Sequence, residues 1–433
     1  MRCSPTGWRV TDTVTFDATD DAVVQCPYPH YREMRDRAPV LELDGAAFGR
    51  AGERIFAVSR HEDVKRILHD PTTFSSKFGS PAAKPSPELL DRLKSVIADG
   101  WPNVPTMLTV DPPAHTRYRR LVSMAFTPKR VNLLAPAIET ICEDLVAGFG
   151  RAPRVDFLTK FAVPLPVRAV AVILEVPETR QADFKRWADS SVAAIGRTIS
   201  DDERVAAERD IVEQQQYFAS EIEARRAAPR DDFLTDLLTA ELAPDDGVEG
   251  GPLDMAEMLS IIRQIQVAGS ETTASLMADL MVLLAEHPDV WERLKADPSY
   301  ATAVVEEGLR WASPNQGLFR IVTADTEIAG TPIPKGSTLW VMYGSADHDD
   351  SLFDEPEAFR PDRAGLSNHI AFGHGIHFCL GAALARLEAV TALRVLASHI
   401  DTITVVDREA LRYGSSFILR GLQHLEVDLT YRD

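Results

Sequence analysis

The chain is poor in cysteine: it has four in 433 residues, and they lie far apart. Their spacings match neither a zinc or iron–sulfur site nor the dense disulfide framework of a small secreted domain. We therefore expect a protein of a reducing compartment, the cytoplasm. Cys3, Cys26 and Cys142 are expected to be ordinary small apolar residues or surface thiols.

Basic residues are also scarce, because 46 Lys and Arg stand against 65 Asp and Glu and give a formal net charge of −19. Nucleic-acid phosphates require a basic face, and anionic membranes attract basic segments. The acidic balance therefore argues against nucleic acid and against a membrane surface as partners.

Long apolar runs are missing as well. The most apolar long stretch, residues 161–176, is interrupted by Pro164, Pro166 and Arg168. It is shorter than the roughly 20 apolar residues that a membrane-spanning helix needs. The N-terminal residues lack the apolar core of a signal peptide, so we expect neither export nor membrane insertion.

What is present is the composition of a globular chain, 45% hydrophobic and 26% charged. Short strands are expected at 39–43, 54–58, 327–328, 338–341 and 424–427. Helices are expected at 61–69, 115–125, 135–149, 201–227, 253–286, 300–311 and 380–400. The longest helix would span about 50 Å and is apolar on most sides, which indicates a central position. The pattern predicts a mainly α fold with a small β-rich subregion and a long loop over 76–107.

The most informative stretch is residues 371–381, AFGHGIHFCLG. It places Cys379 between a glycine-rich turn and the start of a helix. Gly373 and Gly375 permit the positive φ angles of a tight turn, and backbone N–H groups after Cys379 can point at its sulfur. Helix N-termini and nearby cations favour the thiolate, which is a strong ligand for one metal ion and donates electron density to haem iron.

This stretch resembles the haem-binding signature of the cytochrome P450 family, and other stretches between about residues 28 and 428 resemble the family in the expected order. The resemblance implies the fold of a soluble, bacterial-type haem-thiolate monooxygenase, with a long central helix over haem b (iron protoporphyrin IX). We expect residues 28–433 to form this single domain, after an N-terminal extension of residues 1–27.

The resemblance also assigns roles to the cysteine loop and to four residues that would bind the haem carboxylates. Cys379 would be the iron ligand. Phe372 would pack near its sulfur and exclude water, Gly373 would form part of the tight turn, and Gly381 would let the helix pass close beneath the macrocycle. The expected partners of the carboxylates are His115, Arg119, Arg320 and His377. Arginine suits this task because it grips a carboxylate with two parallel hydrogen bonds.

The long helix contains A-G-S-E-T-T at 268–273, which is similar to the oxygen-activation motif of the family. The small residues Ala268 and Gly269 would open a groove for dioxygen. Thr272 can bond back to the carbonyl of Ala268, and Glu271 can relay protons from solvent. Glu271 and Thr272 are therefore the expected catalytic residues.

The resemblance also predicts a structural ion pair and a substrate pocket. Glu307 and Arg310 match the E-x-x-R pattern of the family. In the family this pair contacts an arginine, which would here be Arg363, and its implied role is to hold the cysteine loop in place. The substrate pocket is expected, from position only, to be shaped by the loop 76–107 and by the stretches 315–318 and 416–418. Its expected residues include Ile265, Ala268, Leu318 and Phe417.

The expected function is insertion of one oxygen atom of O2 into a small apolar substrate, with hydroxylation as the default. The chain carries no flavin or nicotinamide fingerprint, so electrons are expected from an external ferredoxin and its NAD(P)H-dependent reductase. A basic cluster at 117, 119, 120, 129 and 130 could receive an acidic ferredoxin. Two alternatives stay open: a peroxide-driven peroxygenase, and a haem-thiolate sensor without turnover.

Overall fold

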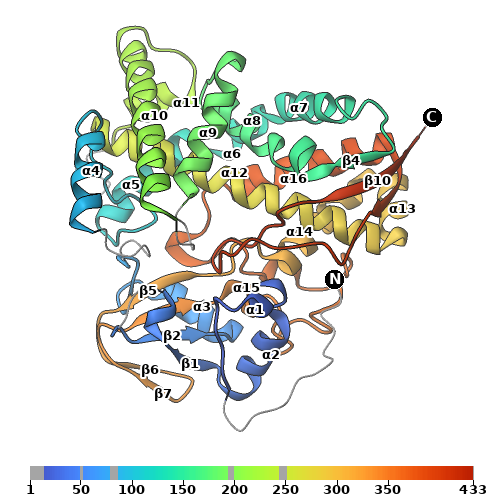
Figure 1. Ribbon diagram of the computed structural model, residues 1–433, viewed down its shortest axis with the longest axis horizontal. Helices are drawn as coiled ribbons and strands as arrows, with labels where there is room; N and C mark the ends of the chain where they lie inside the picture. The colour runs from blue at the N-terminus through green and yellow to red at the C-terminus, as the bar shows by residue number, and fades with distance from the viewer. Residues whose placement is uncertain (1–13, 49–51, 79–85, 194–198, 243–250, 433) are drawn as a thin grey trace.

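The computed structural model describes residues 14–48, 52–78, 86–193, 199–242 and 251–432, and it confirms a mainly α fold with small sheets. Figure 1 shows a helical part above and a sheet-rich part below, with helix α12 between them. The helices are α1 Asp21–Gln25, α2 Tyr28–Arg37, α3 His61–His69, α4 Pro87–Ile97, α5 Ala114–Ala125, α6 Pro128–Leu133, α7 Ala135–Ala147, α8 Pro164–Ile173, α9 Gln181–Val192, α10 Asp201–Ala227, α11 Phe233–Thr239, α12 Met255–Glu286, α13 Pro288–Ala296, α14 Ala301–Ala312, α15 Tyr343–Ala346 and α16 Ala382–His399.

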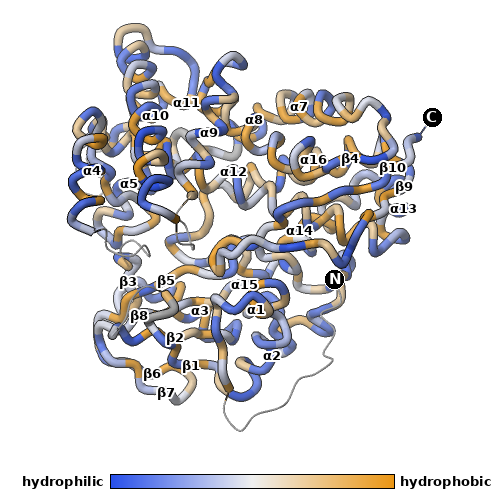
Figure 2. The backbone as a smooth tube through the Cα atoms, in the orientation of Figure 1, coloured by the Kyte–Doolittle hydropathy of each residue, from blue (hydrophilic) through white to orange (hydrophobic). Residues whose placement is uncertain are grey.

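Helix α12 is long and runs through the core. It starts with a capping box, in which the side chain of Asp254 accepts from the backbone of Glu257 and the Glu257 side chain accepts from the backbone of Asp254. Twenty of its residues are buried, and the apolar ones except Ala274 belong to the largest core cluster together with residues of α7, α8, α14 and α16. Figure 2 shows hydrophobic residues along α8 and α12, and many hydrophilic residues on the outer helix α10.

Helix α12 is also the one helix in the described ranges that is long and apolar enough to cross a membrane. Seventy-two per cent of its most apolar 18-residue window is buried inside the fold. Its apolar surface is therefore covered by the neighbouring helices of the same chain.

The β-rich part contains a five-stranded sheet of order β1-β2-β8-β5-β3, in which only β2 and β8 run parallel. Its strands are Val40–Leu43, Ile55–Val58, Thr338–Val341, Leu318–Val322 and Phe74–Ser75. A three-stranded sheet, β4-β10-β9, comprises Arg154–Asp156, Glu426–Tyr431 and Ile400–Val405, and a hairpin pairs β6 Thr326–Ile328 with β7 Thr331–Ile333. The large sheet matters for the site, because β5 carries Leu318 and Arg320.

The sequence predicted the main helices to within three residues at each end, but the structure departs from it in the region 76–107. Helix α4 lies inside this expected loop and packs against α10. Ser86 caps α4, and the side chain of Gln215 on α10 bonds both the N–H and the C=O of Trp101, each at 3.0 Å. The tertiary contact with α10 therefore orders a segment whose prolines had suggested a loop.

The cysteines also differ in part from expectation. Cys142 is buried and free, as expected. Cys26, however, is disulfide-bonded rather than a free thiol. Cys3 lies outside the described residues, as do residues 244–250 of the polar stretch 244–252, for which the sequence suggests a surface loop.

Candidate active site

A cavity of about 250 Å³ lies between the cysteine loop, helix α12, helix α5 and strand β5. The sequence-predicted residues among those lining it are Arg119, Ile265, Ala268, Gly269, Thr272, Leu318, Arg320, Phe372, Gly373, His377, Cys379 and Gly381. These residues come from four separate segments of the chain, which meet at one place.

The cysteine loop has the tight backbone that its glycines predict. Gly373 and Gly375 adopt φ angles of 67° and 70°, in the left-handed region that favours glycine. A Cβ atom on Gly375 would also lie 2.2 Å from the carbonyl oxygen of Leu68 at the end of α3, so no side chain fits. The Cys379 N–H donates to the carbonyl of Phe372 at 2.9 Å, which closes the loop beside the cavity.

The protonation state of Cys379 is set by opposing effects. Burial raises the pKa of its thiol, while the N–H groups of Gly381 and Ala382 and the charges of Arg119 and Arg386 lower it; burial prevails. The expected activation by the helix N-terminus is therefore present but is outweighed in the metal-free chain. Because a metal ion binds the thiolate, a metal bound here would release a proton from Cys379.

Helix α12 presents Thr272 to the cavity. Its hydroxyl donates to the carbonyl of Ala268 at 2.9 Å, the back-bond that the sequence suggested. Ser275 makes the same kind of bond to the carbonyl of Glu271 at 3.0 Å. The side chain of Glu271 is exposed and does not line the cavity, so the two expected catalytic residues occupy the outer and the inner side of one helical turn.

Gly269 also lines the cavity, but the reason for a glycine at this position lies in packing. A Cβ atom there would come within 2.8 Å of the side chain of Val170, which is fully buried on α8. The small residue lets α8 and α12 approach each other, in addition to leaving space on the cavity side.

Four nitrogen-bearing side chains gather at one side of the cavity. The rings of His115 and His377 lie 4.3 Å apart, and His377 also contacts the hydroxyl of Ser76 at 2.8 Å and the carbonyl of Met107 at 3.1 Å. Burial, with the charges of Arg320 and His115, lowers the pKa of His377 to about 3. Burial and Arg119 likewise lower the pKa of His115.

These four groups lack anionic partners within the described ranges. His115 and Arg320 are each 3% exposed, and the buried Nε2 of His115 has no hydrogen-bond partner. Arg320 donates to the carbonyl of Phe319 at 2.8 Å, but neither arginine forms an ion pair with a described carboxylate. An anionic group in the cavity would therefore find preorganised donors.

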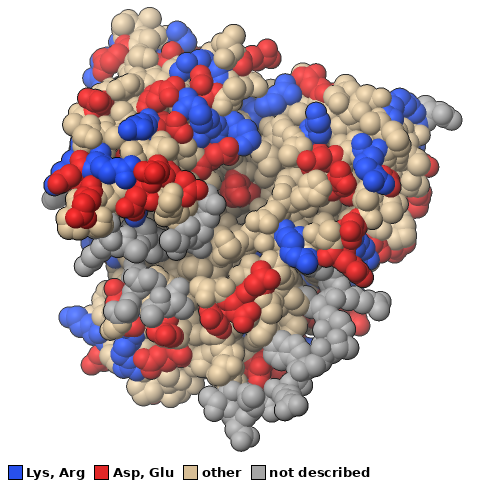
Figure 3. Space-filling view, viewed as in Figure 1, with Lys and Arg blue, Asp and Glu red and all other residues tan. Residues whose placement is uncertain are grey.

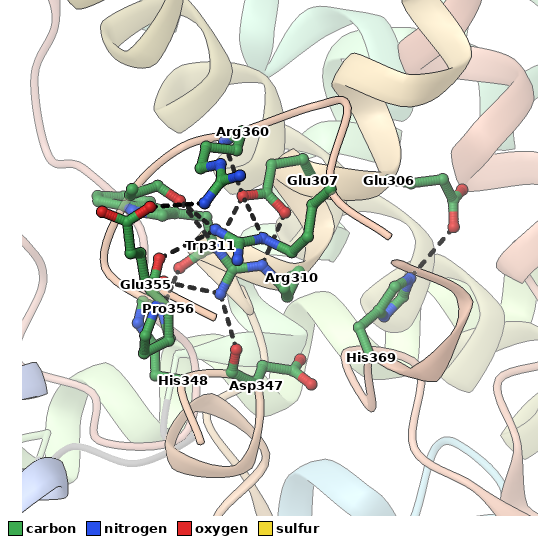
Figure 4. A network of polar contacts seen from close by, with 12 residues as sticks. Glu306, Glu307, Arg310, Trp311, Asp347, His348, Glu355, Pro356, Arg360 and His369 are labelled. Atoms are coloured by element: carbon green, nitrogen blue, oxygen red, sulfur yellow. Dashed lines mark hydrogen bonds and ion pairs between the residues drawn. The ribbon is translucent and has the colours of Figure 1, made fainter. Parts of the chain in front are cut away.

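The E-x-x-R pair lies in a buried network, which Figure 4 draws. Glu307 on α14 accepts two hydrogen bonds from Arg310, at 2.7 and 2.8 Å, and one from Arg363 at 3.3 Å. Arg310 also donates to the carbonyls of Asp347, Pro356 and Ala358. The three side chains thus meet as the resemblance implied and clamp the loop at 354–358.

A family model for cytochrome P450 matches residues 201–399. Cytochrome P450 107B1 of Saccharopolyspora erythraea is 35% identical over 97% of this chain and 98% of its own length. The 6-deoxyerythronolide B hydroxylase of the same organism is 32% identical over 93% of this chain and 96% of its own. The structure of cytochrome P450 CYP109Q5 from Chondromyces apiculatus matches with a TM-score of 0.82 and 34% identity, over 97% and 99% of the two chains. The chain belongs to the cytochrome P450 family.

As a P450 the protein is a monooxygenase with haem b as its cofactor. The cavity suits this group. Cys379 would supply the sulfur ligand, and the unpartnered Nε2 of His115, together with Arg119, Arg320 and His377, suits the two carboxylates of the macrocycle. These residues would hold the cofactor.

The residues expected to contact the substrate of this P450 separate into two groups. Ile265, Ala268 and Leu318 line the cavity. Phe417 does not, because its ring packs instead on Phe48 at 5.0 Å and on Trp340 at 5.7 Å, in the core beneath the sheet. Its position in the sequence gave no sign of this aromatic cluster, which forms through strand β8.

Other cavity residues of the P450 were missed by the sequence. Gln264 adds a polar group to the lining, and Tyr343 lies against Arg320, whereas Asn315, which also lines the cavity, belongs to the expected stretch 315–318. Glu388 on α16 also lines the cavity, and burial raises its pKa well above the ordinary range. No motif marks any of them, although Glu388 follows Gly381 and Ala385 at helical spacing on one face.

Proposed function

We propose that this P450 hydroxylates a small apolar molecule with one oxygen atom of O2, using electrons from an external ferredoxin and its NAD(P)H-dependent reductase. One observation carries the proposal: a single cavity joins the Cys379 loop, the Thr272 turn of α12 and apolar walls. A hydroxylase among the relatives supports the reaction type. Within this proposal the enzyme works in the cytoplasm, residues 28–433 are its catalytic domain, and residues 1–27 are an N-terminal extension.

The lining favours an apolar substrate with few polar groups. Ile265 and Leu318 are apolar, whereas Gln264 and Asn315 supply isolated amides. The Oε1 atom of Gln264 accepts from the hydroxyl of Thr106 at 3.2 Å, so this amide is already oriented. Pockets with mostly apolar walls and a few fixed polar groups bind ligands of the same character.

The chain's own residues supply proton transfer, and haem, when bound, supplies electron transfer and oxygen activation. The hydroxyl group of Thr272 donates to the carbonyl of Ala268, and its oxygen keeps lone pairs that can accept a proton. Glu271 is exposed, so water can reach its side chain. We propose that Glu271 collects protons from solvent and that Thr272 presents them inside the cavity.

The proposal is tested by binding and then by turnover. Haem-loaded protein is screened with steroids, fatty acids, terpenoids, aromatics and polyketides for compounds that shift the iron spin state. A binding compound is then incubated with O2, ferredoxin and reductase, or with hydrogen peroxide alone. Hydroxylated product in the first reaction supports the proposal. Product with peroxide only indicates a peroxygenase, and failure to consume oxygen with every reductase and ligand indicates a sensor.

Replacing Thr272 by alanine is expected to uncouple reduction from product formation. Positioned proton donors contribute on the order of 10²–10⁴-fold, so product per electron pair should fall at least about tenfold while reductant is still consumed. The measurement compares product, NAD(P)H and hydrogen peroxide with a compound identified by the screen. Thr272→Ser keeps the hydroxyl and should restore coupling. Intact coupling in Thr272→Ala would show that Thr272 does not deliver the protons.

The basic cluster proposed for ferredoxin docking is smaller than its sequence suggests. Arg117 forms an ion pair with Glu257 at 2.7 Å, and Arg130 pairs with Asp231 and Asp236 at 2.8 Å each. Lys129 is exposed and has no described partner. On the face that Figure 3 shows, acidic and basic side chains are also intermingled rather than gathered by sign.

Neutralising Lys129 is therefore expected to have a limited effect on electron transfer. Lys129→Gln should slow reduction by an acidic ferredoxin up to about fivefold at low salt, because one exposed charge pair contributes at most about 1 kcal/mol. The difference should vanish as ionic strength rises. Lys160→Gln, at an exposed lysine outside the cluster, is the control. Equal rates for both variants at every salt concentration would exclude docking through Lys129.

A further inference from the structure

Glu306 and Glu307 are neighbours on α14 but serve two separate networks. Figure 4 shows Glu307 among the arginines of the E-x-x-R clamp, while Glu306 points away from it toward His369. The carboxylate of Glu306 accepts from Nε of Arg386 at 2.6 Å and from Nη2 of Arg386 at 2.9 Å. Nε2 of His369 lies 3.2 Å from the same carboxylate. Glu306 therefore fixes the guanidinium of Arg386 with a two-point contact.

Arg386 connects this carboxylate to the cysteine loop. It lies on α16, and its Cζ atom is 4.6 Å from the centre of the Phe372 ring, a cation–π distance. The carbonyl of Phe372 accepts the N–H of Cys379 at 2.9 Å. The positive charge of Arg386 also acts on Cys379 directly, in the direction that favours the thiolate.

The pair is ionised at neutral pH. Burial alone would raise the pKa of Glu306, but the hydrogen bonds from His369 and Arg386 hold it at about 2. The side chain of Glu306 is 19% exposed and that of Arg386 is 36% exposed, so bulk water screens the pair only in part. Because water screens these two charges only in part, they change the energy of a nearby group that gains or loses an electron.

We propose that Glu306 and Arg386 are positioning residues that set the electron-donor strength of Cys379, and with it the ferric–ferrous reduction potential of the bound haem. The guanidinium stabilises negative charge on the cysteine side and raises the potential. The carboxylate fixes the guanidinium over Phe372 and offsets part of its charge. This inference rests on the assignment of Cys379 as the iron ligand.

The proposal predicts potential shifts of opposite sign for the two partners. Arg386→Gln removes the cation and should lower the potential, whereas Glu306→Gln removes the compensating anion and should raise it. Each shift is expected to reach about three- to tenfold in the ferric–ferrous equilibrium constant, where tenfold equals about 59 mV for one electron. Spectroelectrochemical titration of the haem-loaded, substrate-free proteins measures both.

Control variants separate this electrostatic role from a structural one. Arg394→Gln removes the same charge from an exposed position on the same helix and should leave the potential unchanged. Arg386→Lys keeps the charge and should restore most of the wild-type value even if the glutamine variant binds haem poorly. Shifts of the same sign in both glutamine variants, or no shift beyond that of Arg394→Gln, would overturn the proposal.

The ferrous–CO spectrum tests the ligation of iron by Cys379 separately from the role of Glu306 and Arg386. If wild-type protein lacks the thiolate-type CO band, the ligation by Cys379 itself fails. If the band is present in wild-type and variants while the potentials are unaltered, only the role of Glu306 and Arg386 is refuted.

Discussion

Replacing Cys379 by histidine is expected to abolish the thiolate-type ferrous–CO band and to reduce hydroxylation to background. The thiolate donates electron density that favours cleavage of the O–O bond, and a neutral imidazole does not. The sulfur is also the one cysteine sulfur in the described ranges that lines the cavity, so no other thiol can replace it. The measurements are the CO difference spectrum and product formation with a compound identified by the screen.

Cys142→Ala is the matched control for this experiment. Cys142 is a free cysteine that is fully buried on α7, and it does not line the cavity. The control variant should keep the band and the activity, with at most a modest loss of stability from the small cavity it creates. A thiolate-type band that persisted in Cys379→His would mean that another group holds the iron, and the site as described would be wrong.

Proton release on haem binding tests independently whether Cys379 is the iron ligand. Because burial raises the pKa of the Cys379 thiol, the metal-free chain holds this proton at neutral pH. Haem binding by the wild-type apoprotein in weakly buffered solution should therefore release one more proton than haem binding by Cys379→His. The comparison needs no substrate and no redox partner.

The parts of the site that the sequence could predict are those encoded within a few residues. The glycines around Cys379 demand a turn of positive φ, and the spacing of Ala268 and Thr272 is one helical turn, so both local geometries follow from the chain itself. The sequence likewise predicted helix α12, because its apolar pattern is long and its start is capped at Asp254.

The remaining features depend on contacts between distant segments, which the local pattern does not contain. Helix α4 is held by α10, and Phe417 is drawn into an aromatic cluster by Trp340 on β8. Arg117 appeared to belong to a basic docking face, yet Glu257, 140 residues later, binds it at the start of α12. The gathering of His115 and Arg320 beside His377 could be expected only through resemblance to the family.

Replacing Glu307 by glutamine is expected to be the most destabilising of the proposed changes. Glu307 and Arg310 are fully buried, and Arg363 is 8% exposed. All five N–H donors of Arg310 are used: two bond the carboxylate, and three bond the carbonyls of Asp347, Pro356 and Ala358. The glutamine has nearly the same shape but carries no charge, so two buried guanidinium groups would face each other without a counter-ion.

Breaking a buried ion pair from one side costs about 3–5 kcal/mol, while whole domains are stable by only about 5–15 kcal/mol. Glu307→Gln should therefore lose a large part of its free energy of unfolding and should retain little haem, because the loop at 354–358 is no longer clamped. Urea unfolding and the haem content of purified protein measure the two effects. Glu292→Gln removes a 64% exposed carboxylate on α13 and should change the free energy by less than about 0.5 kcal/mol, because its partner Lys295 keeps a second ion pair with Asp401. Equal stability of the two variants would show that the clamp is held by the backbone contacts of Arg310 and not by the charge of Glu307.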